Sequence, residues 1–379
     1  MEKEKILFKI GDDRLSNKQF LAYKKNLNDT LNRLNEFYGG RGEGKIYAQM
    51  NVFSTFQKEY LSKNPPGERS YPDPNERIRV WDEFLKERQD IEDDSMPVCY
   101  LSEFDQGLYA GLVGGEIRFL QNEDTIWISS MVKPFFDDLR LIKDMKLDPG
   151  HIWYKNFQQQ LRVFRDYARG KFGIGHFILI DSFNFLYELR GATRAYLDAE
   201  ENPDLVKTVI DFAYQLNVWV MDTFFEEISL FEGGTFSNFG QWIPGRVVSE
   251  SVDPFHMTSV DYFLKWGKEP IEKIFSYFDG GLIHLHSNGR HLLKSVANLK
   301  GIKAILMAND IWNPPSITLL NEFNTLRDSV PLIVPTTYQD FINSLREHSL
   351  IGNAFYIIDE VPDILVANRL MEEVRNYRI

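Results

Sequence analysis

Two histidines separated by a single residue are the feature of this sequence that most directly suggests chemistry. His284 and His286 lie in the apolar stretch GLIHLH, and three of the seven histidines fall between positions 284 and 291. If this stretch is a β-strand, side-chain alternation places both imidazoles on one face and Leu285 on the other. Paired imidazoles can transfer protons near neutral pH, or they can bind zinc.

The position of the pair within its predicted strand favours a functional site. Asn288-Gly289 marks the end of the strand, and in a β/α barrel the carboxyl ends of the strands form the active site. We therefore expect His286 at the mouth and His284 one layer below. The structural alternative is that one histidine fills the interior and the other is exposed. His291 falls on the next predicted helix and is expected to be solvated.

Both chemical interpretations require a carboxylate near the histidines. For proton transfer, the predicted catalytic set is His284, His286 and Asp310, because Asp310 follows the next apolar strand, IKAILMA. For zinc, a third ligand is required, and the predicted set is His284, His286 and Glu250. Asp253 and His256 are further ligand candidates, and none of these residues lies at a diagnostic spacing.

The elements that would position these residues alternate between strands and helices. From Pro97 onward, short β-branched and aromatic runs are separated by amphipathic stretches, which is the pattern of a parallel α/β fold. No dinucleotide-type glycine motif follows an early strand, so a (β/α)8 TIM-type barrel is favoured over an open doubly wound sheet. We expect one barrel domain over 1–379, with a helical N-terminal extension at 1–95 and the barrel at 96–379.

Several predicted helices and strands carry their own signals. Asn202 and Pro203 predict the start of a helix ending near 227, and Pro270 predicts a kink or split in the helix over 259–278. GEIRFLQNEDTIWISS predicts a hairpin. The expected strands are PVCYLSE, GHFILID, ISLFEG, GLIHLH, IKAILMA, PLIVPT and AFYIID.

Residues that follow the predicted strands describe the rim of the expected active site. The predicted substrate-binding residues are Glu103, Asp105, Asp181, Trp242, Asn288 and Tyr338. Each has a structural alternative, because a carboxylate after a strand often caps the next helix and an aromatic residue often closes the core. Together they predict an acidic, aromatic-edged mouth that suits a neutral or cationic small molecule.

Composition narrows the functional class further. The net charge of −12 and the pI near 5.2 argue against nucleic-acid binding or an anionic membrane surface. No secretion signal or bilayer-length apolar segment is recognisable, so a cytoplasmic protein is expected, either monomeric or homo-oligomeric. The single cysteine, Cys99, excludes internal disulfides and lies in an apolar run, so we expect it to be buried and unreactive.

The chain from about Pro97 onward resembles the uroporphyrinogen decarboxylase superfamily. The segments that carry the resemblance are 188–212, with its Leu-Arg-Gly turn and Asn-Pro helix start, and 251–307, with Pro270 and the histidine-bearing strand. The resemblance runs from about Pro97 to the C-terminus and implies a barrel. The superfamily contains the haem-pathway decarboxylase and zinc-dependent corrinoid and coenzyme M methyltransferases.

Departures from the superfamily pattern select among its branches. Residues 1–60 contain nothing like the arginine-rich Met-Arg-Gln-Ala-Gly-Arg motif that grips propionates, so tetrapyrrole decarboxylation is expected to be absent. His286 stands where the methyltransferases have a zinc-binding cysteine, and Cys99 lies far upstream. A zinc site, if formed, would use histidines and a carboxylate instead.

The resemblance therefore implies a methyltransferase-like enzyme. Methyl transfer to or from a corrinoid protein or a thiol, with a small-molecule substrate and with zinc as the candidate cofactor, is the first expectation. A non-oxidative decarboxylase that uses the histidines as proton donors without a metal is the second. A barrel that binds a small molecule without turnover is the third.

Overall fold

The central element of the molecule is a six-stranded parallel β-sheet. A computed structural model describes residues 19–42, 44–323 and 330–379. The strand order is β1-β13-β12-β11-β10-β9, and every neighbouring pair runs parallel. The strands are β1 (Ile46–Val52), β9 (Val248–Ser251), β10 (Gly281–Leu285), β11 (Ile302–Met307), β12 (Leu332–Thr337) and β13 (Ala354–Val361). The fold class is thus α/β, as the sequence predicts.

Three small sheets accompany the central one. A parallel pair joins β3 (Val98–Tyr100) and β6 (Gly173–Gly175). An antiparallel sheet contains β2 (Gly67–Arg69), β4 (Ile117–Gln121) and β5 (Ile128–Val132), and this confirms the hairpin predicted for 115–130. A second antiparallel pair joins β7 (Gly234–Phe236) and β8 (Trp242–Pro244).

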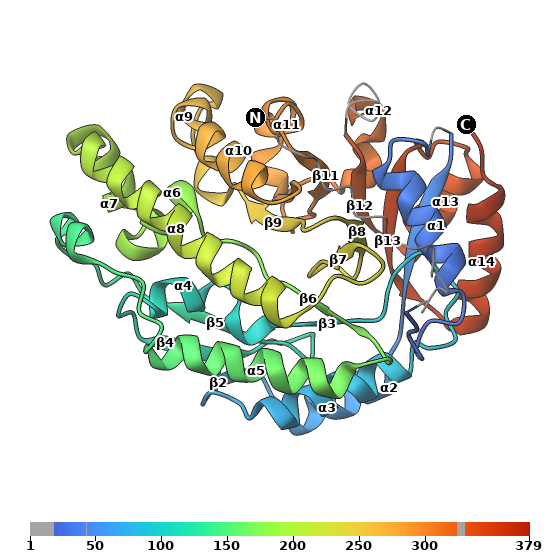
Figure 1. Cartoon of the computed structure of the whole chain (residues 1–379). Helices are drawn as coiled ribbons and strands as arrows, with labels where there is room; N and C mark the ends of the chain where they lie inside the picture. Colours follow the sequence, from blue (N-terminus) through green and yellow to red (C-terminus); the bar gives the residue numbers. More distant parts are fainter. Residues whose placement is uncertain (1–18, 43, 324–329) are drawn as a thin grey trace, which may run out of the picture.

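Helices cover the sheets and connect the parallel strands, and Figure 1 shows the long helix α8 running between α5 and α10. The longer helices are α1 (Leu27–Tyr38), α2 (Thr55–Lys63), α3 (Pro74–Lys86), α5 (Ile152–Ala168), α6 (Ser182–Arg190), α7 (Ala192–Glu201), α8 (Pro203–Glu227), α9 (Val260–Trp266), α10 (Lys268–Tyr277), α13 (Tyr338–Arg346) and α14 (Ile364–Asn376). The short ones are η1 (Ser102–Phe104), α4 (Gly107–Gly111), η2 (Leu139–Asp144), η3 (Asp253–Phe255), η4 (Ser287–Leu292), α11 (Leu293–Ala297), η5 (Ser316–Leu319) and α12 (Leu320–Phe323).

Helix boundaries follow the signals in the sequence. Asn202 precedes α8 and Pro203 occupies its first position, where a missing N–H costs nothing. The predicted interruption near Pro270 is present but lies three residues earlier, at Gly267, between α9 and α10. Pro270 therefore sits in the first turn of α10, which tolerates proline, rather than at a kink.

Three secondary-structure predictions are wrong. Of the strand predicted over 175–181, only Gly175 lies in a strand, because β6 ends there. The segment Ile46–Val52 lies within the region expected to be a helical extension, yet β1 pairs with β13 at the edge of the central sheet. The predicted strand over 228–233 is absent, because α8 extends to Glu227 and β7 begins only at Gly234. The helical extension thus contributes a strand to the sheet.

A (β/α)8 barrel requires a closed ring of paired strands. The structure shows continuous pairing over six parallel strands. One parallel bridge between Ile178 and Ser249 links the segment after β6 to β9. One backbone hydrogen bond, from Asp94 N to Ala48 O (2.8 Å), links the segment before β3 to β1. The structure establishes a mixed α/β fold with a parallel sheet, and barrel closure remains a prediction.

The two faces of the central sheet bury different sets of side chains. The face that carries Leu282 and His284, hereafter the histidine face, packs Leu306, Ile333 and Phe355 against the β7–β8 hairpin and α1. The opposite face packs Ile283, Leu285 and their neighbours against the surrounding helices. Side-chain alternation thus assigns each strand residue to one of two environments.

Cys99 is fully buried in β3, as predicted. Burial raises the pKa of its thiol well above the ordinary value, which disfavours the reactive thiolate. In the part of the chain that the structure describes, no helix is both long and apolar enough to cross a bilayer.

Candidate functional site

The clearest candidate for a catalytic arrangement in the structure is a hydrogen-bonded pair formed by His286 and Asp310. Parallel neighbours β10 and β11 end at the same edge of the sheet, so the residues just after them meet. His286 Nδ1 lies 2.8 Å from Asp310 Oδ1, and Ser287 donates from N (2.7 Å) and Oγ (2.5 Å) to Asp310 Oδ2. Both side chains are about one-third exposed, so this pair is reachable from solvent.

The carboxylate of this pair is held in its ionised form. Partial burial alone would raise the pKa of Asp310, but hydrogen bonds from Ser287 and His286 outweigh it and lower the pKa to about 2. Because an ionised carboxylate only accepts, His286 Nδ1 must carry the hydrogen of this bond. When the imidazole is neutral, Nε2 is therefore left as a proton acceptor.

His284 lies one layer deeper on the same face, as the alternation predicts. Its ring centroid is 4.5 Å from that of His286 and 5.8 Å from that of Phe239. Burial, reinforced by the neighbouring His286, lowers the pKa of His284 to about 4. His284 is thus uncharged at neutral pH and does not repel a positive charge on His286.

A third histidine approaches from the segment that follows β9. His256 is buried with its ring centroid 5.5 Å from that of His286, and burial lowers its pKa to about 4. Asp253 Oδ1 lies 3.8 Å from Nε2 of both His256 and His286. A Cβ on Gly289 would come within 2.2 Å of the His256 ring, so this close approach requires glycine. The site therefore contains three histidines and two carboxylates.

The predicted zinc set is not brought together. Strand register places Ser251 beside His284 and Glu250 beside Ile283, so Glu250 points to the opposite face from both histidines. Over 19–42, 44–323 and 330–379, no three histidine, cysteine, aspartate or glutamate side chains are arranged to hold a metal ion together. The described donor groups thus do not fit the zinc site predicted from the sequence.

Glu250 belongs instead to a buried carboxyl layer behind the sheet. It is fully buried, and burial together with the charge of the neighbouring Asp181 raises its pKa well above the ordinary value. Burial also raises the pKa of Asp181, a residue that the sequence predicts to bind substrate. Asp105 lies nearby with a pKa raised to about 6 by burial, and it accepts a hydrogen bond from Tyr100.

Two predicted substrate-binding residues have structural roles. Glu103 is fully buried, and it pairs with Arg77 through Oε1 and accepts from Gln160 Nε2 (2.8 Å) through Oε2. Trp242 is 2% exposed and donates from Nε1 to Phe231 O (2.6 Å). Neither side chain can reach a ligand, because each is enclosed by the core that it helps to build.

The remaining residues predicted for the rim, Asn288 and Tyr338, do not belong to the hydrogen-bonded group formed by His286, Ser287 and Asp310. Asn288 is exposed in η4, beside His286 in sequence. Tyr338 is the first residue of α13 and packs, partly buried, against the main hydrophobic core. His291 is exposed, and its Nε2 lies 2.9 Å from Thr258 O.

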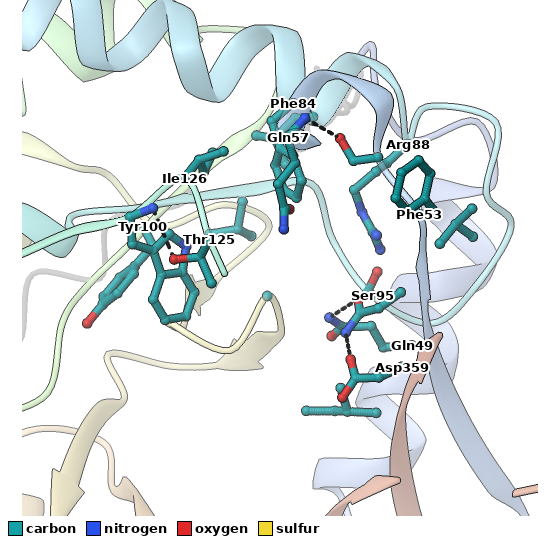
Figure 2. A pocket seen from close by; sticks show the side chains of 18 of the residues that line it. Gln49, Phe53, Gln57, Phe84, Arg88, Ser95, Tyr100, Thr125, Ile126 and Asp359 are labelled. Carbon is teal, nitrogen blue, oxygen red and sulfur yellow. Dashed lines mark hydrogen bonds between the residues drawn. The ribbon is translucent and has the colours of Figure 1, made fainter. Parts of the chain in front are cut away.

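A large cavity adjoins the histidine face and was not predicted from the sequence. It has a volume of about 1080 Å³. Phe239 lines the cavity and also contacts His284, so this side chain lies between the cavity and the histidine pair. Figure 2 shows Tyr100 and Thr125 on one side of the cavity, with Arg88, Gln49 and Asp359 across from them.

The walls of the cavity come from segments far apart in the chain, which is why sequence patterns did not reveal it. They include the ends of β1 and β13, helices α2 and α3, and loops at 124–127 and 238–240. Asp359 could have been found as a polar residue near the end of the predicted strand AFYIID. Arg88 had no comparable signal, since it follows an amphipathic helix among other charged residues.

Comparisons with known proteins show a shared fold. No protein-family model matches this chain, and no curated protein matches it in sequence. Among solved structures, the chain is similar to a methyltransferase from Methanosarcina mazei, with a TM-score of 0.57 and 11% identity over 94% of this chain and 99% of that one. At 11% identity, the likeness shows the fold alone.

Proposed function

We propose that this protein is a methyltransferase-like enzyme that moves a methyl group between a small methylated compound and a corrinoid protein or a thiol. The observation that carries the proposal is the His286–Asp310 pair at the exposed ends of β10 and β11. The fold shared with a methyltransferase from Methanosarcina mazei supports this reaction class.

The pair supplies the proton chemistry that a thiol acceptor requires. A thiol becomes a strong nucleophile only as the thiolate, so a base must accept its proton before sulfur attacks the methyl carbon. His286 Nε2 is the accepting atom, because Asp310 occupies Nδ1 and stabilises the resulting imidazolium. The uncharged His284 beside it adds no opposing charge.

A corrinoid protein, the carrier expected from the sequence, would require an exposed contact surface near the pair. Met257 is 87% exposed next to His256 in sequence, and Ile311 and Trp312 are 91% and 93% exposed directly after Asp310. Large apolar side chains exposed beside a site are typical of protein-binding surfaces. This exposed apolar patch supports the proposal that a partner protein docks beside the His286–Asp310 pair.

The proposal can be tested with methylcobalamin as the methyl donor and 2-mercaptoethanol as the acceptor. We expect the native protein to accelerate demethylation of the corrinoid, followed by its visible spectrum. We expect His286→Gln to lower kcat by about 10²–10⁴-fold, the usual range for loss of a general base. His291→Gln is the matched control, because His291 lies outside the pair and should keep the native rate. A native rate in His286→Gln would refute the proposed role.

One observation favours a second candidate, non-oxidative decarboxylation. Arg88 lines the cavity that adjoins His284, and an arginine is the group best suited to hold a substrate carboxylate. In that reaction a protonated His286 would return a proton to the carbon that loses CO₂. Trapping of labelled CO₂ from a carboxyl-labelled substrate, without methyl transfer, would select this candidate.

A further inference from the structure

The chemistry of the cavity lining points to the class of ligand that it accepts. Much of its wall is aromatic, and the side chains that provide this surface are Phe53, Trp81, Phe84, Trp127 and Phe239. Flat apolar walls favour a ligand with a planar apolar body, through area burial and ring stacking. One cluster of polar groups, Arg88, Ser95, Gln49 and Asp359, lies on one side of the space, and Thr125 lies across from it (Figure 2).

Arg88 presents a positive charge that the protein neutralises only loosely. Its Nη2 donates to Met50 O (3.1 Å), and the nearest carboxylate oxygen, Asp93 Oδ2, is 3.9 Å away. Asp93 is already paired with Lys24 at 3.0 Å and accepts from Met50 N at 2.8 Å. The Arg88 side chain is only 17% exposed, and burial lowers its pKa, so water compensates the charge poorly.

The guanidinium also has unused hydrogen-bonding capacity. A guanidinium carries five N–H donors in a planar fork, which matches the two oxygens of a carboxylate. Within the described part of the chain, only the Nη2 bond to Met50 O is formed by Arg88. Asp359 also lines the cavity and forms no ion pair with Arg88 within 4.0 Å. Space for an anion therefore remains beside the guanidinium.

The acceptor groups near Arg88 define the opposite end of the polar region. Gln49 Nε2 donates to Asn51 Oδ1 (3.0 Å), and Asn51 Nδ2 donates to Asp359 Oδ1 (2.7 Å). This chain of bonds leaves the acceptor Gln49 Oε1 buried without a protein partner in the described part of the chain. An anion is disfavoured at this end by the like charge of Asp359 and by this unpaired acceptor oxygen, so Arg88 is the position where a carboxylate fits.

We propose that the cavity binds a small aromatic carboxylic acid, with its carboxylate on Arg88 and its ring between the aromatic walls. The inference rests on the proposed function only in identifying this ligand as the substrate. It revises the expectation of a neutral or cationic ligand, which was based on the acidic residues predicted around the mouth.

The proposal is tested by comparing matched probes that differ only in charge. Phenylacetate and 3-phenylpropionate are titrated against their amides and against phenethylamine, using isothermal titration calorimetry and the fluorescence of Trp81 and Trp127, which line the cavity. We expect each acid to bind at least about tenfold more tightly than its amide, because a charge-assisted hydrogen bond from arginine to a carboxylate is stronger than one to a neutral amide. Arg88→Met should abolish this preference.

Lys58→Met provides the matched control. Lys58 also lines the cavity but is exposed, so its loss changes net charge without removing the buried anchor. The control should keep the acid preference, and Arg88→Lys, which keeps a charge but loses the fork, should retain only part of it. Equal binding of acids and amides, tighter binding of the amine, absence of binding by any acid, or an acid preference that survives in Arg88→Met would overturn the proposal.

These measurements separate the inference from the proposed function. They require binding but no turnover, so they can be repeated in His286→Gln, which retains the cavity. If that variant binds the acids as the native protein does, a failed turnover assay counts against the proposed function alone. If the acids fail to bind while methyl transfer proceeds, the ligand class is wrong and the enzyme proposal stands.

Discussion

At the scale of single residues, the sequence located the polar groups well where the neighbouring strands were also predicted. The sequence predicts the proximity of His286 and Asp310 because β10 and β11 are consecutive apolar strands, and consecutive strands lie side by side in a β/α barrel. Glu250 and Glu103 were misplaced for a different reason. Their orientation depends on strand register and on long-range partners, Asp181 for one and Arg77 for the other, and neither is visible in local pattern.

The buried Arg77–Glu103 pair gives a direct test of the structural role of Glu103. Arg77→Met leaves a buried carboxylate without its cation, which typically destabilises a protein by about 3–5 kcal/mol. We expect a loss of that size in urea unfolding, followed by tryptophan fluorescence. The folded fraction should keep its turnover rate, because the pair lies outside the site. A loss of substrate affinity with unchanged stability would instead indicate that Glu103 helps to bind the substrate.

At the scale of elements, the strands that are most readily predicted are those with mainly apolar runs. Strands β10 to β13 are of this kind, and their buried residues provide the core on both sheet faces. Strand β1, IYAQMNV, alternates apolar and polar residues and lies between two helices, so it was merged with them. It is held as a strand by its pairing with β13 and by burial of Tyr47 against Phe37 and Phe355.

The contribution of β1 predicts that the N-terminal region is not a detachable extension. A chain that begins at residue 96 would expose the edge of β13 and one wall of the cavity. An unpaired apolar strand edge promotes aggregation, so we expect this truncated chain to be insoluble or unfolded by circular dichroism. A soluble 96–379 fragment with native secondary structure would show that the predicted boundary is a true domain boundary.

At the scale of the whole molecule, the cavity and the carboxyl layer are features that local sequence patterns do not predict. Both are assembled from segments far apart in the chain, and the cavity walls at 49–61 and 357–362 are separated by almost three hundred positions. The fold class was predictable, since alternation of strand and helix is a local signal repeated along the chain. The polar environment inside it was not, because burial depends on every packed element at once.

Buried carboxyl groups make the stability of this protein depend on pH. Burial, with a smaller effect of the Asp105 charge, raises the pKa of Glu188 to about 8. Between the ordinary value of 4.5 and about 8, the folded state holds a proton that the unfolded chain has released. Stability from this group is therefore fully present below pH 4.5 and is lost as pH rises toward 8.

Replacement of Glu188 by glutamine should remove its share of this dependence. We expect the free energy of unfolding, measured in urea at pH 5, 6.5 and 8, to fall less with pH in Glu188→Gln than in the native protein. Glu347→Gln, at an exposed position, is the control and should follow the native curve. Parallel curves for the native protein and Glu188→Gln would mean that Glu188 is ionised in the folded state.

The central claim, that His286 and Asp310 act as one catalytic unit, is tested most directly by a double-mutant cycle. The methyl-transfer rate is measured for His286→Gln, Asp310→Asn and the double variant, with folding checked by circular dichroism. Groups that act together lose activity non-additively, so the double variant should be no slower than His286→Gln alone. Losses that multiply in the double variant, or single variants that keep the native rate, would contradict the account.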